Sequence, residues 1–96
     1  MDVMLTITTR ESGPIAVPLM QALSRAGVTW GCFFTNDGVE LILDDVCQMA
    51  VKSAQRAVIC EHSWAGASIG GDCPVELGSQ TINSAMMTEA GRVVSL

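Results

Sequence analysis

Two kinds of hydrophobic spacing alternate along the chain, and each change of spacing marks the border of a predicted element. Four segments have the composition of strands: 1–8, 28–34, 57–60 and 92–96. In the first of them Val3, Leu5 and Ile7 occupy every second position, which is typical of a strand. Residues 28–34 are rich in β-branched and aromatic side chains without strict alternation, and this predicts a strand buried on both faces.

The segment after the first strand predicts a helix over residues 14–26. Its apolar side chains recur at helical spacing: Ile15, Leu19, Met20, Leu23 and Ala26. Pro14 suits the first helical turn, and Ser12 or Gly13 is placed to cap it. Gly27 is placed to end the helix.

Two further helices are predicted. Asp37 and Glu40 form a capping box that starts the first of these, which extends toward Ala54. Its inward stripe is expected to comprise Val39, Ile42, Leu43, Val46, Met49 and Ala50. Ser79 is the expected cap of the other helix, after an irregular, glycine-containing stretch over 61–75. The inner face of this last helix is expected to comprise Ile82, Ala85, Met86 and Ala90.

The predicted elements alternate in the order β-α-β-α-β-α-β, with short connections. This order indicates an α/β fold in one domain over residues 1–96: a parallel sheet flanked by helices, with flavodoxin-like winding. We expect the first strand to lie between the second and the third. The loop over 9–13 and the segment that begins at Cys60 would then flank the crevice where such folds bind ligands.

Composition narrows the classes of function. Hydrophobic residues make up 49% of the 96 positions and charged residues 16%, which excludes a disordered chain and predicts an oligomer. A net charge of −5 disfavours direct binding to nucleic acid or to anionic lipid. No apolar run approaches the roughly 18 residues that span a bilayer, and the acidic start lacks the basic region of a secretory signal. We expect a cytoplasmic protein without membrane contact.

The four cysteines carry the candidate chemistry, and in the cytoplasm we expect them reduced. Cys32 and Cys47 lie on predicted core faces and are interpreted as packing residues. Cys60 closes the third strand at the mouth of the crevice, and a helical turn starting just after it would favour its thiolate. The alternative is a small apolar residue that ends a strand. Cys73 is a candidate second thiol that would close a disulfide with Cys60, and the alternative is a residue that only precedes Pro74 at a turn or helix start.

The neighbours of Cys60 act in opposite directions. His62 is a candidate partner that would lower the pKa of the thiol, whereas Glu61 would raise it by repulsion. Cys60, His62 and Cys73 supply only three ligands, and their spacing matches no common zinc pattern. No phosphate-binding glycine motif follows the first strand. We therefore expect neither a metal nor a cofactor.

Three segments, taken together and in this order, resemble the DsrE/DsrF/TusD-like sulfurtransferase family of sulfur relays. They are GCFFTNDGVELI at 31–42, AVICEHSWAG at 57–66 and TEAGRVVSL at 88–96. The resemblance implies a DsrEFH-like domain in which Cys60 carries sulfane sulfur as a persulfide. It also implies a TusA-like carrier protein as partner, a homo- or hetero-oligomer of three or six subunits, and a role in sulfur oxidation or tRNA thiolation.

The chain departs from the family pattern in two places. Residues 61–66 stand where the family tends to have small residues and an Arg-Gly pair, and Gly91 replaces the usual aspartate. The missing arginine removes a cation beside the thiolate. A second hypothesis therefore stays open, in which the chain is a non-catalytic assembly subunit of a sulfur-relay complex.

Overall fold

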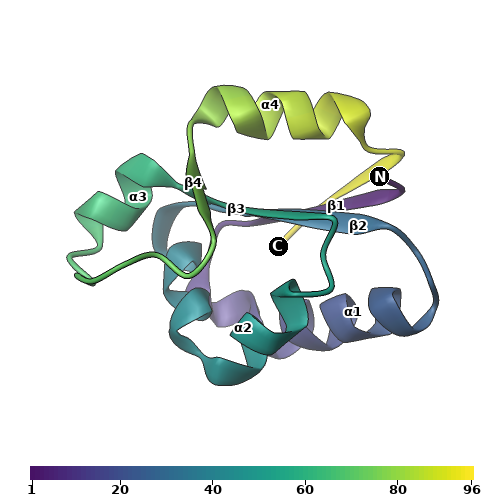
Figure 1. The fold of residues 1–96 in the computed structure, drawn as a ribbon, viewed down its shortest axis with the longest axis horizontal. Coiled ribbons are helices and arrows are strands. Elements are labelled where there is room, and N and C mark those ends of the chain that lie inside the picture. The colour runs from purple at the N-terminus through teal and green to yellow at the C-terminus, as the bar shows by residue number, and fades with distance from the viewer.

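Five parallel strands form the central layer of the computed structural model, which describes residues 1–96 (Figure 1). They are β1 (Val3–Ile7), β2 (Trp30–Phe34), β3 (Arg56–Cys60), β4 (Glu76–Gly78) and β5 (Arg92–Ser95). Their order across the sheet is β4-β3-β2-β1-β5. The chain thus starts inside the sheet, winds outward to β4, and returns to the free side of β1.

Helices cover both faces of the sheet. They are α1 (Gly13–Arg25), α2 (Asp45–Val51), α3 (Glu61–Gly66) and α4 (Gln80–Glu89), with the 3-10 helices η1 (Arg10–Ser12) and η2 (Asn36–Leu43). The helix α4 lies on one face, α1 and α2 lie on the other, and α3 lies beyond the end of β3 (Figure 1). None of the helices has the length and apolarity needed to cross a membrane. The predicted α/β class, with a doubly wound parallel sheet between helices, is confirmed.

Of the two neighbours predicted for the first strand, β2 is confirmed and β3 is wrong. β1 pairs with β2 and β5, and β3 pairs with β2 and β4. The connections between successive strands from β1 to β4 are short, so each of these strands pairs with the one before it in the chain. Only the connection through α4 spans the sheet, from β4 at one edge to β5 at the other. The end of β3 is therefore flanked by the ends of β2 and β4, and Cys60 lies opposite Gly78 in the register.

The segment 61–75 holds more structure than its sequence predicted. It opens with the six residues of α3, none of which is buried, and it leads into β4. Neither element has an apolar period, which is why neither was predicted. The three-residue β4 is fastened at its start, because Arg56 donates from Nε and Nη2 to the two carboxylate oxygens of Glu76 at 3.0 and 2.7 Å.

The predicted capping box is wrong, because both of its acids bond to Arg10 instead. Asp37 Oδ1 accepts the Arg10 N–H at 3.3 Å, and Glu40 Oε2 lies 3.2 Å from Arg10 Nη1. The expected single helix is divided into η2 and α2, with extended backbone at Asp44 between them. The 3-10 winding of η2 and the break at Asp44 change the helical phase, so three predicted core residues are exposed: Leu43, Val46 and Met49.

The predicted ends, caps and inner faces of the other helices agree with the structure in part. Gly27 ends α1 with φ +72°, and Met20 and Met86 are buried as predicted. The inner face of α1 is formed by Ala16 and Val17 rather than Ile15, which is 63% exposed. Ser12 and Ser79 precede their helices as predicted, but neither side chain caps the helix, and Ala85 on α4 is exposed.

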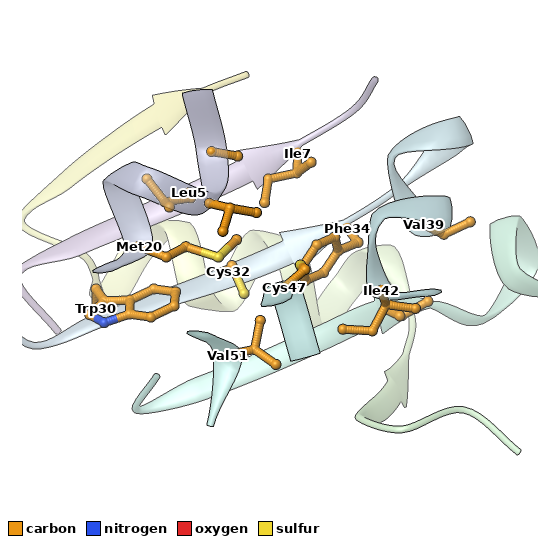
Figure 2. Packing of buried hydrophobic residues seen from close by; sticks show 13 residues of the cluster. Leu5, Ile7, Met20, Trp30, Cys32, Phe34, Val39, Ile42, Cys47 and Val51 are labelled. Atoms are coloured by element: carbon orange, nitrogen blue, oxygen red, sulfur yellow. The ribbon is translucent and has the colours of Figure 1, made fainter. Parts of the chain in front are cut away.

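The core consists of two clusters separated by the sheet. The larger lies under α1, η2 and α2 and includes the buried Trp30, Cys32 and Cys47 (Figure 2). The packing role predicted for these two cysteines is confirmed, because both are fully buried there. The smaller cluster lies under α4: Met4, Phe33, Val58, Cys60 and Met86. Alternate residues of β3 therefore face different clusters, and Cys60 faces α4.

Candidate functional site

Cys60 stands at the junction of a strand and a helix. It is the last residue of β3 and the residue that precedes α3, so the helical turn considered from the sequence does begin directly after it. Its residue surface is 4% exposed. Its side chain belongs to the smaller cluster, together with Phe33 and Met86, at the carboxyl end of β3.

Several hydrogen-bond donors act on the Cys60 thiol. Burial raises its pKa, but the side-chain and backbone donors of Ser63, the side chain of Gln80 and the backbone N–H of His62 lower it. The donors outweigh burial, so the pKa lies below the ordinary value for a cysteine. Cys60 is the only one of the four cysteines whose pKa is lowered. The site thus favours a thiolate, the nucleophilic form of sulfur.

Ser63 is held in place by the loop that follows β2. The Asn36 N–H donates to Ser63 Oγ at 2.9 Å, and Thr35 Oγ1 lies 3.4 Å from the same oxygen. Asn36 has a φ of +53°, a left-handed conformation that asparagine tolerates better than most residues. These contacts position the Ser63 hydroxyl, which is one of the donors that lower the pKa of the Cys60 thiol.

Gln80, the first residue of α4, links the start of that helix to the thiol site. Its Nε2 donates to Thr35 Oγ1 at 3.3 Å, and its Oε1 accepts from Asn83 Nδ2 at 3.1 Å. The segments that follow β2, β3 and β4 therefore meet around one sulfur. The sequence interpretation missed Ser63 and Gln80, because it predicted an irregular stretch over 61–75 and no strand β4 beside β3. The available signal was that polar residues follow each of these three strands.

We predict that Ser63→Ala raises the pKa of the Cys60 thiol, because the variant loses the hydroxyl donor while burial remains. A hydrogen bond to a charged group contributes about 1.5 kcal/mol, which corresponds to about a tenfold smaller thiolate fraction. Alkylation of residue 60 by iodoacetamide should be slower by about that factor at low pH, where both thiols are mostly protonated. The two rates should converge at high pH, where both thiols are ionised.

Ser84→Ala is the matched control for this prediction, because it removes an exposed hydroxyl from α4. Its alkylation profile should overlay that of the wild type. If Ser63→Ala also overlaid the wild type, the hydroxyl of Ser63 would have no part in ionising Cys60.

His62 and Glu61 take different positions from those the sequence suggested. His62 acts on the thiol through its backbone N–H, and this exposed residue is among those that line a neighbouring groove. The Glu61 side chain is exposed, and the pKa of Cys60 is set by the donors rather than by repulsion from this carboxylate. No group of three His, Cys, Asp or Glu side chains is placed to hold a metal ion.

Cys73 lies apart from Cys60. It is half-buried just before β4 and packs against the larger cluster, on the face of the sheet opposite to Cys60. Burial raises the pKa of its thiol, although the Val75 N–H opposes this. All four cysteines are free thiols. A role for Cys73 as a second thiol stays a prediction, and it requires the segment before β4 to move.

A groove of about 300 Å³ opens between η2 and α3, beside the thiol site. Its lining residues are Asn36, Asp37, Glu40, His62, Ser63, Gly66 and Ala67. Cys60 does not line it, but Ser63 contacts the sulfur and also forms part of the groove wall. Any occupant of the groove is therefore separated from the reactive sulfur by a single side chain.

The chemistry that this arrangement supports is nucleophilic attack by a hydrogen-bonded thiolate on another sulfur or on a carbon electrophile. Burial raises the pKa of Cys47 to about 11, and it also raises the pKa of Cys32, so neither competes with Cys60 near neutral pH. Comparison of the chain with family models, with curated proteins and with solved structures found no match in any of the three.

Proposed function

We propose that this chain is a sulfur-carrier subunit of the DsrE/DsrF/TusD-like type, in which Cys60 holds sulfane sulfur as a persulfide. The observation that carries the proposal is the position of Cys60, which ends β3 directly before α3 at the carboxyl end of the sheet. Ser63, Gln80 and His62 support it there, because their donors lower the pKa of the thiol. The resemblance of three segments to that family supports the same residue. A small domain needs only one acidic thiol for this chemistry.

Each transfer moves one sulfur atom between two cysteines. The Cys60 thiolate attacks the outer sulfur of a donor persulfide, forming a new S–S bond, while the S–S bond of the donor breaks. The donor leaves as a thiolate, and Cys60 becomes the persulfide. In the second transfer an acceptor thiolate attacks the outer sulfur on Cys60, and the Cys60 thiolate leaves. No external oxidant or reductant is consumed.

The donors around Cys60 contribute to both transfers. Before loading they favour the thiolate that attacks, and on unloading they stabilise the same thiolate as it leaves. A lower pKa of the leaving thiol speeds its departure. Ser63 and Gln80 therefore favour both the loading and the unloading of sulfur at Cys60.

The proposed partner is a small TusA-like carrier, and the proposed assembly is a homo- or hetero-oligomer of three or six subunits. We place the relay in the cytoplasm, where thiols stay reduced, consistent with four free cysteines. Neither a cofactor nor nucleic acid takes part in the proposed transfer.

The direct test is intact mass after incubation with a persulfide donor. The wild-type protein is expected to gain one sulfur atom, about 32 Da, which dithiothreitol removes. Fragmentation of the tryptic peptide over 57–92 should place the added sulfur on residue 60 rather than on Cys73. A protein that keeps its original mass under these conditions would contradict the proposal.

A second candidate function is a non-catalytic assembly subunit, and the 4% exposure of Cys60 favours it. In that case the thiol is a packing residue shielded from a partner. The alkylation rate of wild-type Cys60 against pH separates the two functions. A sulfur carrier should show an apparent pKa below the ordinary value of about 8.5, whereas an assembly subunit should show one at or above it.

We predict that the chain assembles in solution. Large apolar side chains are exposed on the layer of α1, η2 and α2, among them Ile15, Val46 and Met49. The sheet also has two open edges, β4 and β5, with Leu77 and Val93 exposed. Light scattering should give a multiple of 10.1 kDa, and a mass of one chain across a micromolar dilution series would refute assembly.

A further inference from the structure

Charges are divided unevenly between the two ends of the sheet. Four of the five basic residues lie where helices end or strands begin, away from Cys60: Arg25, Lys52, Arg56 and Arg92. Only Arg10 lies at the Cys60 end, in the η1 helix that follows β1. Acidic side chains gather at that end on η1, η2 and α3: Glu11, Asp37, Glu40 and Glu61. The reactive end of the molecule therefore carries a negative field.

The groove between η2 and α3 concentrates this charge. Asp37 and Glu40 both line it, and each uses one carboxylate oxygen in its contact with Arg10, at 3.3 and 3.2 Å. Their remaining oxygens have no hydrogen-bond partner within the chain. A volume of about 300 Å³ accommodates one long side chain rather than a folded segment. The unused acceptors match a donor-rich cation.

The groove and the sulfur share Ser63 as a wall. A cation seated in the groove lies one side chain away from Cys60, close enough to act on charge at the sulfur. Sulfur transfer brings together two anionic sulfurs, the Cys60 thiolate and the persulfide or thiolate of the partner. Repulsion between them slows their approach, and a cation beside the pair offsets that repulsion.

We infer that this groove binds a lysine or arginine side chain of the protein that exchanges sulfur with Cys60. The identity of the partner as a sulfur carrier rests on the proposed function. The preference of the groove for a cation depends only on the placement of Asp37, Glu40 and Arg10 in this chain.

The first test measures thiol–disulfide exchange at Cys60 in the Cys73→Ser protein. Three symmetrical disulfides of similar size serve as probes: cystamine with two ammonium groups, 2-hydroxyethyl disulfide without charge, and dithiodipropionate with two carboxylates. In each reaction the Cys60 thiolate attacks one sulfur and the other leaves as a thiolate. Relative to free cysteine, cystamine should react about tenfold faster than dithiodipropionate at low salt. The preference should vanish near 1 M salt, where the Debye length is about 3 Å.

Variants locate the source of the preference. Asp37→Asn and Glu40→Gln should each reduce it several-fold. Arg10→Gln should increase it, because that change removes the guanidinium that pairs with Glu40, while Asp37 keeps its bond from the backbone N–H of residue 10. Glu89→Gln is the matched control, since it removes one carboxylate from the far end of α4 and should leave the preference unchanged. Equal rates for the three disulfides in the wild type at low salt would overturn the inference.

A second test does not depend on the reactivity of the thiol. N-acetyl-arginine amide, titrated into the ¹⁵N-labelled full chain, should shift the backbone signals of Asn36 and Gly66. The neutral isostere N-acetyl-citrulline amide should not, and Asp37→Asn should weaken the response. Shifts that are equal for both compounds, or absent for arginine, would contradict a cation site. If the cation site is found but Cys60 never gains sulfur, the proposed function fails and the groove assignment stands.

Discussion

The Cys60→Ser protein is expected to gain no sulfur from a persulfide donor and to deliver none to a TusA-like carrier. The loss should be complete, because burial raises the pKa of each of the other three thiols, Cys32, Cys47 and Cys73, so none of them readily forms a thiolate. Serine has nearly the shape of cysteine, so the fold should survive. Intact mass after loading, with circular dichroism as the check on folding, measures the outcome.

Cys73→Ser is the matched control for this loss. It should gain one sulfur as the wild type does, since Cys73 lies on the opposite face of the sheet. Slower unloading in this variant would support a role for Cys73 as a second thiol, which requires it to approach Cys60. If Cys60→Ser still gained one sulfur, the carrier residue would have to lie elsewhere in the chain.

Gly38→Ala is expected to destabilise the protein by about 3 kcal/mol, a large effect for the addition of one methyl group. A Cβ at this position would collide with the backbone carbonyl of Ile7. That carbonyl cannot retreat easily, because it accepts the Thr35 N–H at 2.9 Å. Urea denaturation should show a lower midpoint with an unchanged slope.

Gly66→Ala provides the control for this measurement. It adds the same methyl group to α3, where no atom lies within 4 Å of the new Cβ. Its stability should equal or slightly exceed that of the wild type, because alanine favours a helix more than glycine does. A Gly38→Ala midpoint equal to that of Gly66→Ala would contradict the close packing of η2 against β1.

Hydrophobic pattern alone predicts those parts of the fold that bury apolar surface. Alternation identifies β1, and the dense apolar run at 28–34 identifies β2, because these strands line both clusters. β4 escapes this signal, since Glu76 and Leu77 are exposed on an edge strand of three residues. The capping box failed for a related reason, because Arg10, distant in sequence, competes for both acids.

The residues of the candidate site likewise divide into one that the sequence pattern predicts and others that it does not. Cys60 is predictable, because a short apolar strand ends at it and polar residues follow. Ser63 lies near it through the first turn of α3, which has no apolar period. Asn36 and Gln80 come near it only through the strand order, which hydrophobic spacing does not encode. Hydrogen bonds between segments distant in sequence are decided by tertiary contacts, so they become visible only in the folded structure.

The ion pair at the start of β4 has a consequence for the thiol at the other end of the sheet. Gln80 follows β4 after only Ser79, so any slip of this edge strand along β3 carries the amide with it. A slip of one residue displaces Gln80 by about 3.3 Å, beyond hydrogen-bond reach of the sulfur. The bidentate bond between Arg56 and Glu76 opposes such a slip. The pKa of Cys60 thus depends on the alignment of β4, which an ion pair at the opposite end of the strand stabilises.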